Sequence, residues 1–211
     1  MLTQFLEISH ESIQMAARTI RNGGLVIYPT DTVYGLGCDP LNEEAVNKLA
    51  KVKQRIKGNL PVLVSTLQKA RELGEIGGDS ETLALRFWPG PLTIVVSAIA
   101  DFPTQVIGRD RMIGLRVPRR GDTVDLISKS GGSLIGTSAN ISGTPSLRQA
   151  RDTLTLFDGK VDVVLNGGSL STLVESTVVT SSRAGVKVLR DGAISRGEMR
   201  KALGPNVKLQ D

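Results

Sequence analysis

Amphipathic helical segments and short apolar runs alternate along this chain, with glycine or proline at most of the junctions. The first helical segment follows Ser9, and its apolar residues recur from Ile13 to Ile20 at the i, i+3, i+4, i+7 spacing of one helix face. Two glycines end this segment, and the apolar run 25–28 follows at once, as expected for a buried strand. The alternation predicts an α/β protein in which helices cover a sheet.

The same pattern continues to the last residues. Further helices are predicted after Asn42, from Ser65 to Gly74, over 122–130, after Ser146, and after Ser195, which forms a capping box with Glu198. Further strands are predicted over 61–64, 92–96, 112–117, 134–135, 161–165, 177–179 and 186–189. Because the last three strands follow one another directly, we predict a mixed, twisted, open sheet flanked by helices, in one domain over residues 1–211.

The chain contains one histidine and one cysteine. A Cys/His zinc site, a histidine-based catalytic triad and a structural disulfide are therefore excluded. The remaining groups are lysine, arginine, serine, threonine and backbone amides, which bind anions and position reactants and so favour phosphate chemistry. We expect His10 to lie on the surface, and Cys38, which has no nearby histidine and no cysteine partner, to be buried filler.

The formal charge of +5 permits attraction to nucleotides or nucleic acid without demonstrating it. Aromatic residues make up 3% of the chain, too few for a base-stacking platform. The apolar stretches 25–28 and 92–100 are too short to span a bilayer, and the first residues lack a basic region followed by an apolar core. We therefore expect a cytoplasmic protein that does not bind a membrane.

Two polar fingerprints stand out, Lys53-Gln54-Arg55 with Asn59 and Ser138-Ala139-Asn140. Taken alone, the first is typical of a solvated helix end and the second of a turn after a strand. A P-loop over 131–138 is disfavoured, because this segment lacks the lysine and has a predicted strand where the loop should wrap a phosphate. Together the two fingerprints indicate an enzyme that handles nucleotides.

Seven segments, including both fingerprints, carry a wider signature. They are Pro29 to Gly37, Lys53-x-Arg55-x-x-x-Asn59, Phe87 to Thr93, Gly114 to Pro118, Ser138 to Gly143, Glu175 to Val179 and Leu189-Arg190-x-Gly192. In order and spacing these segments closely resemble the YrdC-like family over nearly the whole chain. Single segments are moderately specific, but seven in register are not expected by chance.

The resemblance implies a reaction. Members of the family are threonylcarbamoyl-AMP synthases (L-threonylcarbamoyladenylate synthases), which combine L-threonine, bicarbonate and ATP and release pyrophosphate. Their product serves a transferase complex that forms threonylcarbamoyladenosine in tRNA. The implied fold is an open α/β sheet with a concave, positively charged cavity that holds threonine at its base and ATP with its Mg²⁺ at its mouth. Larger relatives have a further C-terminal domain, so this chain resembles the single-domain form.

Residue by residue, the resemblance implies two sets of contacts. The threonine contacts are Thr32, Arg116 and Ser176, and the Arg116 guanidinium suits the amino-acid carboxylate. The contacts to ATP are Lys53, Arg55, Asn59, Ser138, Asn140, Ser146 and Arg190, with magnesium near Ser138 and Asn140 and no Cys or His ligand. Within this set the catalytic role falls to Lys53 and Arg55. Their task would be to neutralise and orient the triphosphate so that a carbamate oxygen meets the α-phosphorus in line.

The chain departs from the family pattern at three places. Leu60-Pro61-Val62 stands where relatives usually have Pro-Leu-Ile, Val64 where many have a histidine near the threonine, and Gly136 where some have threonine. We therefore expect one threonine contact to be missing and the threonine pocket to be roomier or differently hydrogen-bonded. The ATP positions are unchanged.

Two other interpretations stay open. An RNA-binding module, for tRNA or double-stranded RNA, fits the positive charge and would lose affinity steeply with salt. A paralogue of the YciO type, without the synthase activity, would have diverged from the Lys-x-Arg and Ser-x-Asn pattern. This chain has both motifs, which favours the synthase.

Overall fold

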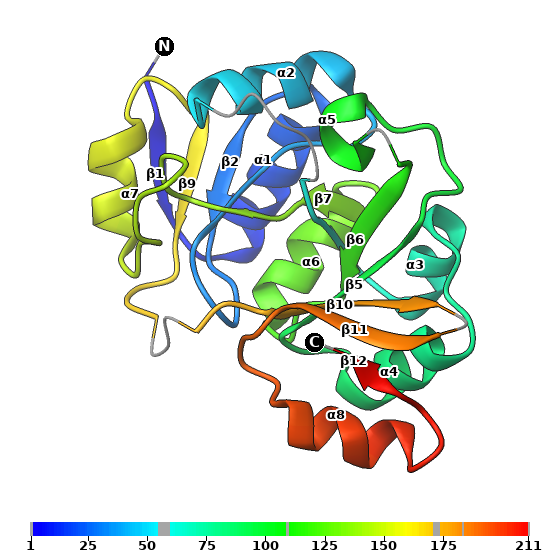
Figure 1. Cartoon of the computed structure of the whole chain (residues 1–211). Coiled ribbons are helices and arrows are strands. Elements are labelled where there is room, and N and C mark those ends of the chain that lie inside the picture. Colours follow the sequence, from blue (N-terminus) through cyan, green and yellow to red (C-terminus); the bar gives the residue numbers. More distant parts are fainter. Residues whose placement is uncertain (1, 55–59, 109, 171–173, 183, 211) are drawn as a thin grey trace.

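The computed structural model describes residues 2–54, 60–108, 110–170, 174–182 and 184–210. Within these residues the strands form two sheets, one of five strands in the order β1-β9-β2-β3-β8 and one of seven in the order β12-β11-β10-β5-β6-β4-β7. Helices surround both sheets (Figure 1). The predicted α/β class, with mixed sheets flanked by helices, is confirmed, and the strands divide between two sheets instead of forming one.

The five-stranded sheet contains β1 (Gln4–Glu7), β9 (Val163–Asn166), β2 (Val26–Tyr28), β3 (Gly35–Gly37) and β8 (Thr137–Ser138). β9 lies between β1 and β2 and runs parallel to both, whereas β3 is antiparallel to β2 and to β8. The sequence pattern places β9 beside β10 and β11, the strands that follow it in the chain. In the structure β9 pairs instead with β1 and β2, two strands from the start of the chain.

The seven-stranded sheet contains β12 (Leu209–Gln210), β11 (Gly185–Arg190), β10 (Thr177–Ser182), β5 (Leu92–Ser97), β6 (Met112–Arg116), β4 (Val62–Val64) and β7 (Ser133–Ile135). Parallel pairs (β11 with β12, β10 with β5, β6 with β4) alternate with antiparallel pairs (β10 with β11, β5 with β6, β4 with β7). The two sheets meet at Gly136, between β7 and β8, whose N–H donates to the Pro61 carbonyl at 2.8 Å.

Two glycines of β3, Gly35 and Gly37, show why this segment can pair as a strand. A Cβ atom at Gly35 would lie 2.8 Å from the Tyr28 ring, and one at Gly37 would lie 2.3 Å from the Ile135 carbonyl oxygen. Both distances are shorter than side chains tolerate, so only glycine lets β3 lie this close to Tyr28 of β2 and to Ile135 of β7. The two glycines thus allow a close approach between β3 and neighbouring strands of the protein.

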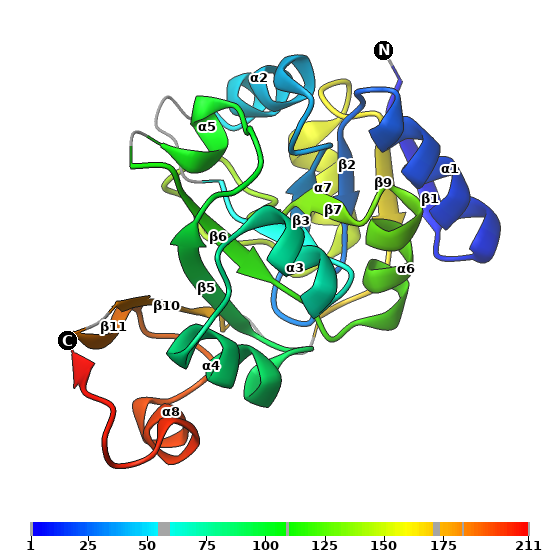
Figure 2. The same ribbon diagram turned by 90° about the vertical axis from the view of Figure 1, so that its right-hand side faces the viewer.

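The helices are α1 (His10–Arg21), α2 (Glu43–Val52), α3 (Leu67–Leu73), α4 (Asp79–Phe87), α5 (Thr104–Ile107), α6 (Gly121–Lys129), α7 (Ala150–Phe157) and α8 (Arg196–Leu203). α1 and α6 pack against each other, and α4 packs against α8, on a different side of the molecule (Figure 2). No helix in the described ranges is long and apolar enough to cross a bilayer.

Local sequence signals place several of the helix starts. Three predicted N-caps are confirmed by side-chain oxygens that accept a backbone N–H: Ser9, Asn42 and Ser195. The helix predicted from Ser65 to Gly74 is present as α3, with Thr66 as its cap, whereas the cap predicted at Ser146 is wrong, because α7 begins at Ala150. Helices α4 and α5 lie outside the predicted set, and both begin without the side-chain cap that marks the starts of α1, α2, α3 and α8.

Candidate active site

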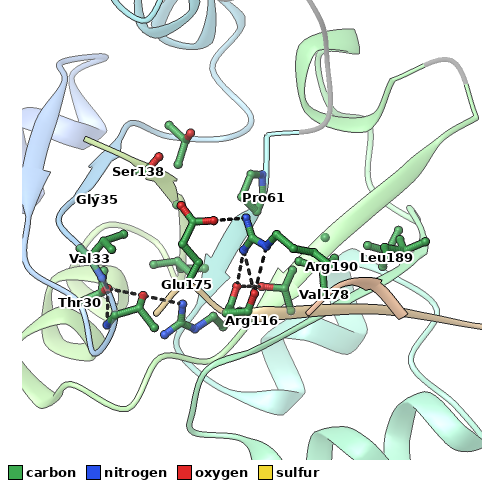
Figure 3. Close-up of a pocket in the computed structure, with 18 of the residues that line it drawn as sticks. Thr30, Val33, Gly35, Pro61, Arg116, Ser138, Glu175, Val178, Leu189 and Arg190 are labelled. Atoms are coloured by element: carbon green, nitrogen blue, oxygen red, sulfur yellow. Dashed lines mark hydrogen bonds and ion pairs between the residues drawn. The ribbon is translucent and has the colours of Figure 1, made fainter. Parts of the chain in front are cut away.

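A cavity of about 370 Å³ lies between the two sheets. Its walls come from β3 and β8 of the five-stranded sheet, from β4, β5, β6, β10 and β11 of the seven-stranded sheet, and from the segment that joins β2 to β3. Figure 3 shows two polar groups in it, one around Arg116 and one around Arg190 and Glu175. The rest of the lining is largely apolar and includes Val33, Pro61, Leu63, Val95, Met112, Val178 and Leu189.

The Arg116 cluster consists of Arg116, Asp31, Thr32 and Thr30. Arg116 is the last residue of β6 and is buried. Its Nε donates to the Gly90 carbonyl at 3.0 Å, its Nη1 to Thr32 Oγ1 at 3.2 Å, and its Nη2 to Asp31 Oδ1 at 2.5 Å. Three groups from two loops therefore fix the plane of the guanidinium, which is then preorganised for a ligand.

Thr30 builds the loop that carries Thr32 and Asp31. Its hydroxyl oxygen accepts the backbone N–H of Thr32 at 3.0 Å and of Val33 at 3.2 Å, and it donates to the Val33 carbonyl at 2.7 Å. A hydroxyl that bonds its own backbone two and three residues ahead closes a tight turn directly after Pro29. The sequence prediction omits Thr30, although it lies in the quoted segment Pro29 to Gly37.

Asp31 is the buried counter-ion of Arg116. The two side chains are 14% and 6% exposed, and Asp31 Oδ2 accepts no hydrogen bond from the described residues. A buried carboxylate that loses its only ionic partner is costly, so Asp31 and Arg116 depend on each other.

The Arg190 cluster consists of Arg190, Glu175, Ser176, Ser146 and Thr93. Arg190 donates from Nε and Nη2 to the Ser176 carbonyl, at 3.2 and 2.9 Å, and from Nη2 to Ser176 Oγ at 3.1 Å. Its Nη1 forms an ion pair with Glu175 Oε2, and Glu175 Oε1 accepts from Ser146 Oγ at 3.1 Å. Thr93 Oγ1 lies 2.9 Å from Ser176 Oγ. The network continues from the rim of the cavity into its wall.

Lys53 holds the Ser138-Ala139-Asn140 segment in place without lining the cavity itself. Its side chain is buried, and Nζ donates to the Asn140 carbonyl at 3.0 Å, to Asn140 Oδ1 at 3.3 Å and to the Ser138 carbonyl. Ser138 Oγ in turn donates to Asn140 Oδ1 at 2.5 Å. The two fingerprints are therefore in direct contact, and among these residues it is Ser138 that lines the cavity.

The structure brings together half of the residues predicted for the site. Thr32, Arg116, Ser138, Ser176 and Arg190 line the cavity. Lys53, Asn140 and Ser146 bond to lining residues, and Arg55 and Asn59 lie outside the described residues. The prediction places Ser176 with Thr32 and Arg116, and the structure bonds it to Arg190. The polar lining residues that the prediction omits are Thr30, Thr93, Thr137 and Glu175.

The structure explains two of the departures from the family pattern, those at Val64 and Gly136. Val64 is fully buried in the core and does not line the cavity, whereas its neighbour Leu63 does, as strand alternation requires. A Cβ at Gly136 would lie 2.5 Å from Leu63 Cγ. The Leu63 side chain therefore fills the space that a side chain at position 136 would take, and the absence of a side chain there does not enlarge the pocket.

Cys38 and His10 lie where the sequence predicts, the first in the core and the second on the surface. Cys38 is buried, and burial raises the pKa of its thiol above the ordinary range, which keeps it protonated and unreactive near neutral pH. His10 is exposed at the start of α1. Within the described residues, no three His, Cys, Asp or Glu side chains gather to hold a metal ion.

Several known proteins are similar to this chain in sequence and in fold. The threonylcarbamoyl-AMP synthase of Pyrococcus abyssi is 36% identical over 199 residues, 93% of this chain and 58% of the relative. The enzyme of the same name from Coxiella burnetii is 36% identical over 160 residues, 74% of this chain and 86% of the relative. This chain thus spans less than two thirds of the P. abyssi protein but most of the C. burnetii one.

Solved structures agree. P. abyssi Sua5 complexed with L-threonine matches with a TM-score of 0.91 and 33% identity, over 100% of this chain and 63% of that one. Escherichia coli YciO matches with a TM-score of 0.86 at 22% identity, over 94% of this chain and 100% of that one, a likeness of fold alone. The Sua5/YciO/YrdC family model, described as "Telomere recombination", matches residues 18–192. The chain therefore belongs to the Sua5/YciO/YrdC family.

Proposed function

We propose that this chain is an L-threonylcarbamoyladenylate synthase, a nucleotidyltransferase that makes threonylcarbamoyl-AMP and pyrophosphate from L-threonine, bicarbonate and ATP. One observation carries the proposal: a single cavity presents a buried arginine, Arg116, and a half-exposed arginine, Arg190. An amino acid and a polyphosphate each need a cationic contact, and these two are held separately. Similarity to P. abyssi Sua5, which was solved with L-threonine, supports the amino-acid substrate.

At the amino-acid end, Arg116 would bind the threonine carboxylate. A guanidinium has five N–H groups, and bonds to the described residues engage Nε, Nη1 and Nη2 once each. A further N–H on each terminal nitrogen can donate to a ligand. Two parallel N–H groups match the geometry of a carboxylate, which favours an amino acid over a neutral ligand here.

At the nucleotide end, Arg190 and Ser138 would contact the triphosphate. Magnesium would enter with ATP as part of the substrate, and it prefers oxygen ligands. Ser138 Oγ fits this need because it lines the cavity, whereas Asn140 Oδ1 already accepts bonds from Ser138 and Lys53. Lys53 would then act by positioning Ser138, since its Nζ donates to the carbonyl groups of this loop.

The proposed chemistry needs orientation more than proton transfer. The threonine amine adds to bicarbonate with loss of water to give a carbamate, and a carbamate oxygen attacks the α-phosphorus. The bond from the α-phosphorus to the bridging oxygen breaks, and pyrophosphate leaves. The contribution of the protein would be to hold both substrates in line and to exclude water with the apolar part of the cavity.

The product would pass to a transferase complex that modifies tRNA, and we propose the cytoplasm, where ATP and tRNA occur together, as its location. Direct contact with tRNA is not required for the reaction. If the chain were instead an RNA-binding module, RNA affinity would fall steeply with salt and ATP would compete weakly.

The test is pyrophosphate release measured while each substrate is omitted in turn, with D-threonine as the matched control for L-threonine. We expect release only when L-threonine, bicarbonate and MgATP are all present. Release that does not depend on threonine would contradict the proposal. A thermal shift that ATP and L-threonine produce cooperatively would support it independently, because ligands that bind the native state raise its melting temperature.

A further inference from the structure

Glu175 places a carboxylate between two residues assigned to ATP. Its Oε1 accepts from the Ser146 hydroxyl at 3.1 Å, and its Oε2 pairs with Arg190 Nη1. A hydroxyl and a guanidinium are also the donors that a phosphate oxygen accepts from in protein sites. The carboxylate of Glu175 therefore holds the two donors in the way that a ligand phosphate would.

Glu175 is also the acidic side chain among the described residues that line the cavity. Like charges a few ångströms apart repel, so a polyphosphate at Arg190 is disfavoured while Glu175 stays there. The Glu175 and Arg190 side chains are 39% and 47% exposed, and exposed ion pairs are weak. The pair is thus strong enough to form without a ligand and weak enough for a highly charged ligand to break.

Arg190 does not need Glu175 to stay in position. Its Nε and Nη2 donate to the Ser176 carbonyl and Nη2 also to Ser176 Oγ, and Ser176 is buried. If Glu175 turns away, these bonds still orient the guanidinium and Nη1 becomes available to the ligand. The carboxylate is therefore the partner that a ligand would displace.

We propose that Glu175 is a positioning residue that occupies the phosphate contacts of Arg190 and Ser146 until a polyphosphate displaces it. This inference rests on the proposed function. The charge of Glu175 sets a threshold, because a ligand must bring enough negative charge to compete with it. ATP and pyrophosphate meet that threshold better than AMP, so Glu175 contributes to the preference for a nucleotide that carries a polyphosphate.

Titration calorimetry with pyrophosphate, ATP and AMP tests the inference on the wild type and on Glu175→Gln, with and without Mg²⁺. The control is Glu72→Gln, which removes the same charge from an exposed pair with Lys69 on α3, outside the cavity lining. We expect Glu175→Gln to bind pyrophosphate and ATP about two- to fivefold more tightly than the wild type, in line with the worth of an exposed ion pair. Its preference for ATP over AMP should narrow. Glu72→Gln should match the wild type.

Tighter binding separates this role from a purely structural one, since loss of a structural contact weakens binding. Unchanged or weaker binding by Glu175→Gln would overturn the inference, and weakening confined to Mg²⁺ would make Glu175 a metal ligand instead. An equal gain in affinity in Glu72→Gln would show that the tighter binding comes from the change in net charge alone. A wild type that binds neither ATP nor pyrophosphate would refute the proposed function itself, which distinguishes the two failures.

Discussion

Two arginines line one cavity, each paired with a carboxylate, and the two pairs differ in burial. Arg116 and Asp31 are 6% and 14% exposed, whereas Arg190 and Glu175 are 47% and 39% exposed. A buried pair is costly to break, because it leaves an uncompensated charge away from water, and an exposed pair contributes little. The Arg116 end of the cavity is therefore preorganised, whereas the ion pair at the Arg190 end can break at little cost.

The difference fits the two proposed substrates. An amino acid is small and must be distinguished from close analogues, which favours a rigid contact. A triphosphate is large and highly charged and arrives with a metal, which favours contacts that exchange partners. The comparison predicts that substitutions at the Arg116 end lower the stability of the protein, whereas substitutions at the Arg190 end weaken nucleotide binding.

The largest effect is expected for Arg116→Ala. Removal of one partner of a buried pair costs about 3 to 5 kcal/mol, which for a chain of this size lowers the melting temperature by roughly 6 to 20 °C. Threonine affinity should fall by about 10- to 150-fold through loss of a charge-assisted contact, with ATP affinity little changed. Denaturant unfolding and titration calorimetry measure both.

A double-mutant cycle provides the control. Asp31→Ala combined with Arg116→Ala should recover part of the lost stability, because no charge is then left buried, but it should not recover threonine binding. If ATP affinity collapsed in Arg116→Ala while threonine affinity persisted, the assignment of the two ends would be reversed.

Arg190→Ala should have the opposite profile. The free energy of unfolding should change by less than about 1 kcal/mol, because the pair is exposed. The kcat/KM for ATP should fall by about 10- to 150-fold if Arg190 contacts the phosphates. Arg111→Ala, which removes an arginine from an exposed pair with Asp101, is the matched control and should behave like the wild type. Activity of Arg190→Ala within twofold of the wild type would remove Arg190 from the ATP site.

The smallest effect is expected at Cys38. This residue lies in the core and belongs to neither arginine–carboxylate pair, so its substitution is a reference for the other two. Burial raises the pKa of its thiol in the folded state, so the native protein keeps this proton more tightly than the unfolded chain. Stability is then unaffected below the ordinary thiol pKa of about 8.5 and falls above it, by up to about 1.4 kcal/mol per pH unit. Urea unfolding from pH 8 to 9.5 should show this slope in the wild type and a reduced slope in Cys38→Ala. Equal slopes would show that the thiol plays no part.

The fold class could be predicted from the sequence because helix periodicity, apolar runs and caps are local signals. The division into two sheets could not, since β9 joins strands that lie far from it in sequence. Family motifs identified several cavity residues from the sequence. Thr30 and Glu175 could not be identified in this way, because their importance depends on hydrogen bonds that residue type alone does not predict. The burial of Lys53 likewise depends on contacts with Ser138 and Asn140, far along the chain.

The bond broken in ATP tests the proposed function most directly. The protein would be incubated with α-labelled ATP, L-threonine, bicarbonate and Mg²⁺, and the labelled nucleotides resolved over time. We predict a labelled AMP adduct that forms only with threonine present and decays to AMP, with pyrophosphate as the other product. Stoichiometric ADP would contradict the proposal, because it would place the transfer at the γ-phosphorus instead of the α-phosphorus.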